Sequence, residues 1–221
     1  NDTATASPKG PLSQSRSNAC GTGDQSFGYV GGGEGNNNEN MSLLERVDYS
    51  NDTATAVVRG PLIYSLRTSS ASSSKQNANP VQSLQPASTV RENVTPQGTD
   101  FGYFGAGTPG PKTSVDRIDY SNDTATAVAK GPLNSTRDYA AATGNGLFGY
   151  FGGGRPGSLS SVDRIDYSND TATASPKGTL SSTRSFMTAT GSASFGYFGG
   201  GTPGILSIVD RVDYSNDTAT A

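Results

Sequence analysis

Apolar positions along the chain fall in short runs that end at residues favouring turns. In the segment 122–168 the strand candidates are residues 124–128, 139–143, 148–151 and 162–167. Gly131-Pro132 and Gly144-Asn145-Gly146 separate three of them, and both are typical of chain reversals. No segment keeps a helical period over a useful length. The pattern therefore predicts an all-β chain of short strands joined by tight turns.

The same pattern recurs from one end of the chain to the other. The phrase Asn-Asp-Thr-Ala-Thr-Ala begins at residues 1, 51, 122, 169 and 216, at intervals of 50, 71, 47 and 47. Phe-Gly-Tyr and Asp-Arg-Ile-Asp-Tyr phrases recur once per interval, with small variations. Four strands in a period of this length are typical of a propeller blade. We expect one repeat domain, 1–221, with units 1–50, 51–121, 122–168 and 169–215, and with 216–221 as the start of a further repeat.

The order of elements in each unit resembles that of kelch repeats. The residues that carry the resemblance are, in order, Gly105-Ala106-Gly107, the strand 115–119, the turn 122–124, Pro132-Leu133 and Arg137. The chain departs from the kelch pattern in having Ile118 where the family has Tyr and Ala125 where it has Trp. The resemblance implies a β-propeller of four-stranded kelch-like blades.

The wording of the units is also similar to that of structural and fibre-like proteins of marine bacteriophages. That resemblance implies a place in a virion or at an extracellular surface, with protein partners or identical subunits. The number of blades stays open. Four units could close into a ring if residues 3–7 paired with 209–214; otherwise the units belong to a larger propeller or to an open array. The start in mid-motif, without Met, is what we expect of a processed product or a piece of a longer chain.

Composition removes several classes of function. The chain has no histidine, which excludes Ser-His-Asp and Cys-His nucleophile pairs, histidine zinc sites and the copper site of oxidases built on kelch propellers. A net charge of −3 without long runs of one sign gives no footprint for nucleic acid. No apolar stretch approaches the roughly 20 residues that cross a bilayer. The one cysteine, Cys20, excludes an intrachain disulfide, and its small neighbours indicate a packed thiol.

Repeated aspartates remain as candidates for chemistry. Asp116, Asp119 and Asp123 recur at the same places in the later units, whereas an active site is normally one asymmetric set. We expect the Asp123 type to hydrogen-bond turn backbone, and the other two types to pair with the arginines equivalent to Arg117 or Arg137. Calcium bound in each turn is the alternative, although the spacing differs from the twelve-residue calcium loop. A polysaccharide-active enzyme would need a carboxylate pair unique to one unit.

Glycine runs and aromatic pairs have structural interpretations. The run 152–154 is followed by no helix and no lysine of a phosphate-binding loop, so we expect it to allow close backbone approach at a strand end. Phe148 and Tyr150 stand at strand spacing, which favours packing between blades. We therefore expect a protein without catalytic activity and without a cofactor.

One unit breaks the symmetry of the repeat. Between Arg67 and Phe101 it carries about 24 more residues than the regular units, mainly Ser, Asn, Gln and Pro. Insertions in repeat proteins form loops, often on a binding face, although a loop without a binding role fits the composition equally well. If the loop, about 68–99, contacts a partner, the expected contacts are Asn77, Gln82, Arg91 and Asn93.

Two hypotheses of function follow. The first is a non-catalytic structural protein of a virion or an extracellular fibre or surface assembly. The alternative is a lectin-like propeller or adhesin that binds a protein or a surface glycan through the inserted loop.

Overall fold

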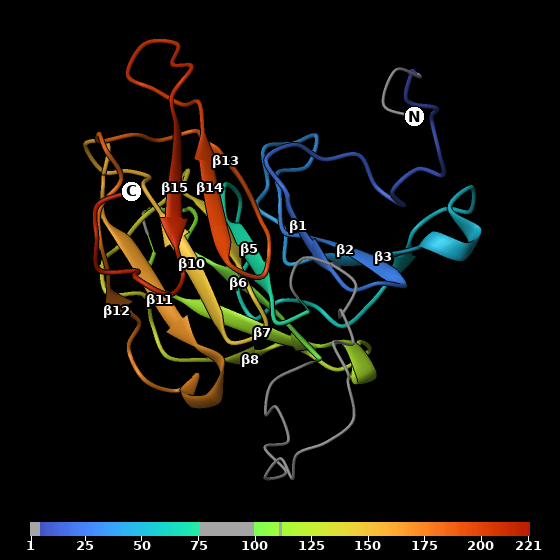
Figure 1. Cartoon of the computed structure of the whole chain (residues 1–221). Helices are drawn as coiled ribbons and strands as arrows, with labels where there is room; N and C mark the ends of the chain where they lie inside the picture. Colours follow the sequence, from blue (N-terminus) through green and yellow to red (C-terminus); the bar gives the residue numbers. More distant parts are fainter. Residues whose placement is uncertain (1–4, 76–99, 111) are drawn as a thin grey trace, which may run out of the picture.

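Four antiparallel sheets form the blades of a four-bladed β-propeller (Figure 1). The computed structural model describes residues 5–75, 100–110 and 112–221. Within these ranges the chain contains strands and three short 3-10 turns but no α-helix. The prediction of an all-β propeller is confirmed.

Successive strands of each blade pair side by side. Blade 1 comprises β1 (Cys20–Gly23), β2 (Phe27–Gly31), β3 (Leu44–Asp48) and β4 (Val57–Val58), and blade 2 comprises β5 (Ser70–Ser73), β6 (Phe101–Gly105), β7 (Val115–Asp119) and β8 (Val128–Ala129). Blade 3 comprises β9 (Ala141–Gly144), β10 (Phe148–Gly152), β11 (Val162–Asp166) and β12 (Ser175–Pro176). Blade 4 has three strands, β13 (Thr188–Gly191), β14 (Phe195–Gly199) and β15 (Val209–Asp213). The 3-10 turns η1 (Tyr49–Asn51), η3 (Tyr120–Asn122) and η4 (Tyr167–Asn169) follow the third strands of blades 1 to 3.

The blades are out of phase with the sequence units. Each Asn-Asp-Thr-Ala-Thr-Ala phrase between two units lies between the third and fourth strands of one blade, so a blade takes its fourth strand from the next sequence unit. The predicted strand 124–128 is therefore wrong. Ala125 N donates to the carbonyl of Asn122 at 3.2 Å, and Ala127 N donates to that of Pro61 at 2.9 Å, across the boundary with blade 1. The backbone of this segment is thus bonded to its own turn and to another blade, and only Val128–Ala129 pairs within the sheet.

Small residues on the first strands allow the four blades to converge. β1 lies beside β5, β5 beside β9, and β9 beside β13 around the centre of the molecule (Figure 1). A central cavity of about 480 Å³ is lined mainly by glycine, alanine and threonine, including Gly21, Thr22, Ala71, Ala142, Ala189 and Thr190. Larger side chains on these strands would hold the blades further apart.

The hydrophobic core lies between the blades, in three clusters that each draw on two neighbours. Blades 2, 3 and 4 each contribute one fully buried phenylalanine, Phe104, Phe151 and Phe198. Each packs on a glycine of the blade before it, respectively Gly31, Gly105 and Gly152. A Cβ at Gly152 would lie 2.8 Å from the Phe198 ring. The expected roles of these glycines in close approach, and of the Tyr150-type aromatics in packing between blades, are confirmed.

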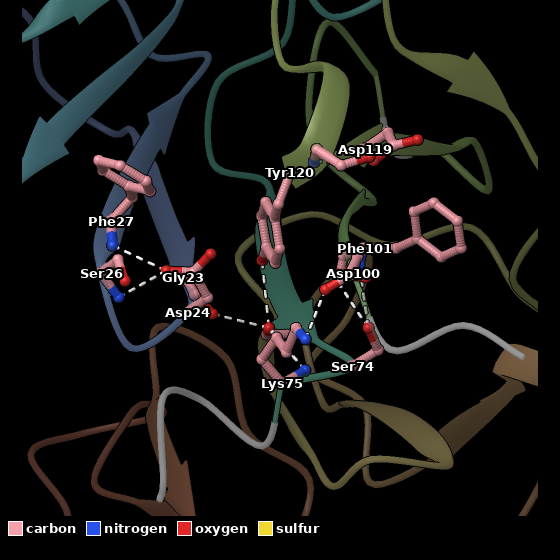
Figure 2. A network of polar contacts seen from close by, with 12 residues as sticks. Gly23, Asp24, Ser26, Phe27, Ser74, Lys75, Asp100, Phe101, Asp119 and Tyr120 are labelled. Carbon is pink, nitrogen blue, oxygen red and sulfur yellow. Dashed lines mark hydrogen bonds and ion pairs between the residues drawn. The ribbon is translucent and has the colours of Figure 1, made fainter. Parts of the chain in front are cut away.

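The inserted segment leaves blade 2 at the hairpin between β5 and β6. Ser74 N donates to the carbonyl of Phe101 at 3.0 Å, and Lys75 forms an ion pair with Asp100. Figure 2 shows these residues gathered at one end of the strand pair, with Tyr120 reaching toward them from the end of β7. The insertion is therefore shorter than the predicted loop 68–99, because residues 70–73 form β5 and pair with β6.

Removal of residues 76–99 should leave the fold intact. The deletion joins β5 to β6 through Ser74, Lys75 and Asp100, which matches in length the turn 145–147 between β9 and β10. The closing bonds match too, since Asn145 N donates to Phe148 O at 3.0 Å. Because closure of a shorter loop costs less entropy, we expect the free energy of unfolding to be unchanged or to rise, by at most about 2 kcal/mol. Urea denaturation of both chains measures this, and loss of cooperative unfolding would contradict it.

Candidate functional site: the junctions between blades

A tyrosine and an aspartate from neighbouring blades meet at each of three junctions. The hydroxyl of Tyr29 donates to Asp123 at 2.9 Å, that of Tyr103 to Asp170 at 3.0 Å, and that of Tyr150 to Asp217 at 2.9 Å. The ring of each stacks on a second tyrosine of the following blade, with centroids 4.9, 4.6 and 4.6 Å apart, in the pairs Tyr29–Tyr120, Tyr103–Tyr167 and Tyr150–Tyr214. The same contact is thus made three times along the chain.

Two cations from the blade of the first tyrosine complete each junction. Arg164 Nη1 lies 2.7 Å from Asp217 Oδ2, and Lys177 Nζ lies 3.3 Å from Oδ1. Arg117 with Lys130 surrounds Asp170, and Arg46 with Arg59 surrounds Asp123, at 2.7 to 3.2 Å. The three aspartate side chains are only 7 to 8% exposed. Charge-assisted bonds in such a desolvated place are stronger than those of a surface pair.

The tyrosines of the junctions stay protonated over the physiological range. Burial, together with the adjacent aspartate, raises the pKa of Tyr29, Tyr103 and Tyr150 well above the ordinary value. A neutral hydroxyl can donate to a carboxylate, whereas a phenolate would repel it. These tyrosines therefore act as fixed hydrogen-bond donors.

The expected roles of two aspartate types are exchanged. Asp119 Oδ1 accepts from Ser121 N at 2.9 Å and so caps the 3-10 turn, as Asp48 and Asp166 do in their blades. Asp123, for which we predicted bonds to turn backbone, instead uses its side chain across the junction. Arg117 likewise pairs with Asp170 of the next blade. Spacing along the chain cannot distinguish an acid that caps its own turn from one that lies on another blade.

A second buried ion pair holds the third strand of a blade to the segment that precedes its first strand. Arg137 Nη2 lies 2.9 Å from Asp163 Oδ2, and neither side chain is exposed. Arg137 Nη1 also donates to the carbonyls of Phe151, Gly153 and Ser161. Blades 1 and 4 contain the equivalent pairs Arg16–Glu45 and Arg184–Asp210. The predicted pairing of this aspartate type with the Arg137 type is confirmed in blades 3 and 4.

Blade 2 lacks this pair, because Leu66 stands at the position of the arginine. Leu66 is buried, and Asp116, on β7, is buried at 1% exposure. Asp116 Oδ2 accepts from Ile63 N at 2.9 Å, while Oδ1 has no hydrogen-bond partner. Burial raises the pKa of the Asp116 carboxyl above its ordinary value. Among the described residues, Asp116 is therefore a buried acid without a cationic partner, and the substitution at Leu66 was the signal for it in the sequence.

The carboxylates are surrounded by organic cations and not arranged as a metal site. Within residues 5–75, 100–110 and 112–221, no group of three or more Asp, Glu or Cys side chains could hold a metal ion. Asp123, Asp170 and Asp217 are each bonded to two cationic side chains and a tyrosine hydroxyl. Such a set compensates the charge of these three carboxylates with side chains of the protein itself.

The predicted partner contacts lie outside the described residues. They are in the segment 76–99 and comprise Asn77, Gln82, Arg91 and Asn93. Lys75 and Asp100 flank this segment. In the part of the chain that the structure describes, no helix is long and apolar enough to span a membrane.

The single cysteine is a half-buried free thiol. Cys20 Sγ lies 3.2 Å from Ser69 Oγ, across the boundary between β1 and the segment before β5. Burial raises the pKa of the Cys20 thiol to about 11, so that the unreactive thiol form prevails near pH 7. This agrees with the packed thiol expected from the sequence.

Comparison with known proteins returned no match, either to a family model or to a curated protein sequence.

Loss of a junction aspartate should destabilise the fold far more than loss of its exposed counterpart. In Asp170→Ala, Arg117 and Lys130 lose their common acceptor in a buried place, which should cost about 3–5 kcal/mol of unfolding free energy. Asp52→Ala is the matched control. Asp52 occupies the same position after β3, but it is 39% exposed and, among the described residues, forms an ion pair with Lys9 alone, so a loss below about 1 kcal/mol is expected. Equal losses in chemical denaturation would contradict this assignment.

Restoring the missing arginine should stabilise blade 2. In Leu66→Arg the guanidinium can pair with Asp116, and we expect a gain of about 1–3 kcal/mol at neutral pH. Because the pKa of Asp116 is raised in the fold, its charge destabilises the native wild type at neutral pH, and this effect disappears as the acid is protonated. The gain should therefore begin to shrink as the pH falls through the raised pKa of Asp116, which lies above the ordinary carboxyl range, and it should be smaller still below that range. Denaturation at two pH values tests this, and a loss at neutral pH would mean that blade 2 has no room for arginine.

Proposed function

We propose that this chain is a non-catalytic structural module of a virion or of an extracellular fibre or surface assembly. The observation that supports it is the threefold repetition of the Tyr–Asp–cation junction. At these junctions aspartate, arginine, lysine and tyrosine side chains, which can serve in catalysis, are bonded to one another between blades. Repeated use of the same contacts favours mechanical continuity, whereas an active site requires one asymmetric constellation.

The environment of Asp116, the acid that lacks the arginine of its counterparts, argues against catalysis as well. Asp116 is buried at 1% exposure and bonded to backbone amides. Glycosidase chemistry requires two carboxyl groups that face a bound sugar. At 1% exposure, Asp116 has no access to a bound sugar.

Recognition through the insertion is the second candidate. The ion pair between Lys75 and Asp100 and the bond from Ser74 to Phe101 close the base of the insertion at the end of a hairpin. A loop held in this way can present its residues to a glycan or protein while blade 2 stays folded. In this candidate the deletion of residues 76–99 abolishes binding to a glycan array or a protein partner. Unchanged binding by the folded deletion variant would reject it.

Two measurements test the structural proposal. Quantitative mass spectrometry of particles and extracellular fractions from the source organism should find the chain there, in amounts typical of a structural component. The purified chain should release no product from a panel of polysaccharides. Confinement to the cytosolic fraction, or turnover that is abolished by Asp116→Asn, would contradict the proposal.

A further inference from the structure

The outer face of blade 4 carries one half of a junction without the other half. Tyr197 stands on β14 where Tyr29, Tyr103 and Tyr150 stand in the other blades. Within the described residues its hydroxyl has no hydrogen-bond partner and its ring stacks on no other ring. Arg211 is exposed, lies opposite Tyr197 in the pairing of β14 with β15, and stacks over the ring of Phe195, 4.6 Å from the centroid. Among the described residues it has no carboxylate partner in an ion pair. Gly199 likewise has no aromatic ring packed on it.

Blade 1 carries the complementary half. Tyr49 corresponds to Tyr120, Tyr167 and Tyr214, which are 4 to 8% exposed, but Tyr49 itself is 49% exposed. Asp52 corresponds to Asp123, yet its side chain is 39% exposed, and it forms an ion pair with Lys9 at 3.3 Å. A junction between blades 4 and 1 would thus have all the side-chain types of the other three, but it is not formed.

The segment before blade 1 is a copy of an outermost strand. Residues 7–10 repeat the Ser-Pro-Lys-Gly of residues 175–178, in which Ser175–Pro176 forms β12. Gly178 N donates to Asp217 O at 2.8 Å, and Gly10 N donates to Asp52 O at 2.7 Å in the same way. Lys9 pairs with Asp52 as Lys177 pairs with Asp217. Residues 9–11 therefore sit on blade 1 in the position of a preceding blade's outer strand.

Ser7 and Pro8 themselves are exposed and pair with no strand, while β15 has no neighbour on its outer side among the described residues. In blade 3 the pairs are Asp163 with Pro176 and Arg164 with Ser175. The same register would place Pro8 opposite Asp210 and Ser7 opposite Arg211. Blade 4 thus lacks an outer strand, and Ser7-Pro8, which has the sequence of such a strand, is unpaired.

The described residues do not join these two halves within one chain. Backbone bonds link the blades near the centre, from Thr68 N to Asn18 O, from Tyr139 N to Thr68 O and from Phe186 N to Tyr139 O. In the part of the chain that the structure describes, no such bond joins Asn18 and Phe186. Figure 1 shows the N-terminal segment and β15 well apart. The ring closure considered from the sequence, with residues 3–7 on 209–214, is therefore not made by residues 5–7.

We propose that a second copy of this chain docks on blade 4, head to tail. Ser7 and Pro8 of the second copy complete the sheet beside β15, and Tyr49 of the second copy stacks on Tyr197. Asp52 of the second copy accepts from the Tyr197 hydroxyl and pairs with Arg211, as Asp217 does with Tyr150 and Arg164. A head-to-tail contact uses different surfaces on the two partners, so it builds open filaments or larger rings and not a twofold dimer. The inference rests on the proposed structural role and specifies its partner.

Two variants test the contact, each altered on one face only. Asp52→Arg disables the blade 1 face, and Tyr197→Arg disables the blade 4 face, where it would add to the charge of Arg211. Both positions lie outside the three formed junctions, and unfolding curves like the wild type would confirm that the fold is kept. Lys112→Asp, a charge reversal in blade 2, is the control, because Lys112 forms no ion pair with any described residue.

Light scattering over a wide dilution series gives the expected outcomes. The wild type and Lys112→Asp should form species with masses that are multiples of 22.6 kDa, whereas each face variant alone should remain monomeric. A mixture of Asp52→Arg and Tyr197→Arg should give dimers of one chain of each, since one intact face remains on either partner. A monomeric wild type at all concentrations, or self-association that neither variant reduces, would overturn the proposal.

This result is independent of the test for the proposed function. A monomeric chain found in extracellular particles would refute the head-to-tail contact and leave the structural role standing. Self-association of a chain confined to the cytosol would refute the structural role and leave the head-to-tail contact standing.

Discussion

Neutralisation of one buried carboxylate at each junction is the constraint on which the propeller depends. Only 32% of the residues are hydrophobic, and the three core clusters between blades are correspondingly small. A carboxylate with so little exposure would strongly oppose folding without cations and donors around it. With a tyrosine hydroxyl and two cations in place, the same group fixes the direction and register of neighbouring blades. The apolar contact of phenylalanine on glycine is non-directional and could not set that register alone.

The fold was largely accessible from the sequence, because its period is visible. Aromatic strands such as Phe148–Gly152 and the turn around Asn145 follow from local pattern, since neighbours along the chain form them. The segment 124–128 was mispredicted because its backbone partners lie partly in another blade. The Tyr–Asp contacts were missed for the same reason: Tyr29 and Asp123 are 94 positions apart. A tyrosine and an arginine recur in each unit, and a cation precedes each of the glycines at 60, 131 and 178, which was a usable signal. The role of these residues becomes clear only when two neighbouring blades are seen in contact.

Blade 2 concentrates the irregularities of the molecule. It has Leu66 in place of the buried arginine, an unpaired Asp116, and the insertion between β5 and β6. It is also one of the two blades with a formed junction on both sides, to blade 1 through Asp123 and to blade 3 through Asp170. Support from two neighbours compensates for a weaker interior. A central blade is accordingly the place where a repeat chain can accept departures that an end blade could not.

The offset between sequence unit and blade has a consequence for the gene. Blades 1 to 3 each take their outer strand from the unit that follows, and the units at 122–168 and 169–215 are nearly the same in sequence. Unequal crossing-over between such copies adds or removes one whole period, wherever within the period the breakpoint falls. The product keeps the same order of strands, tyrosines, cations and acids, so each new neighbour meets a compatible surface. Chains that gain or lose a period by recombination can therefore still fold. A protein in which each pair of blades has its own specific contacts could not tolerate such a change.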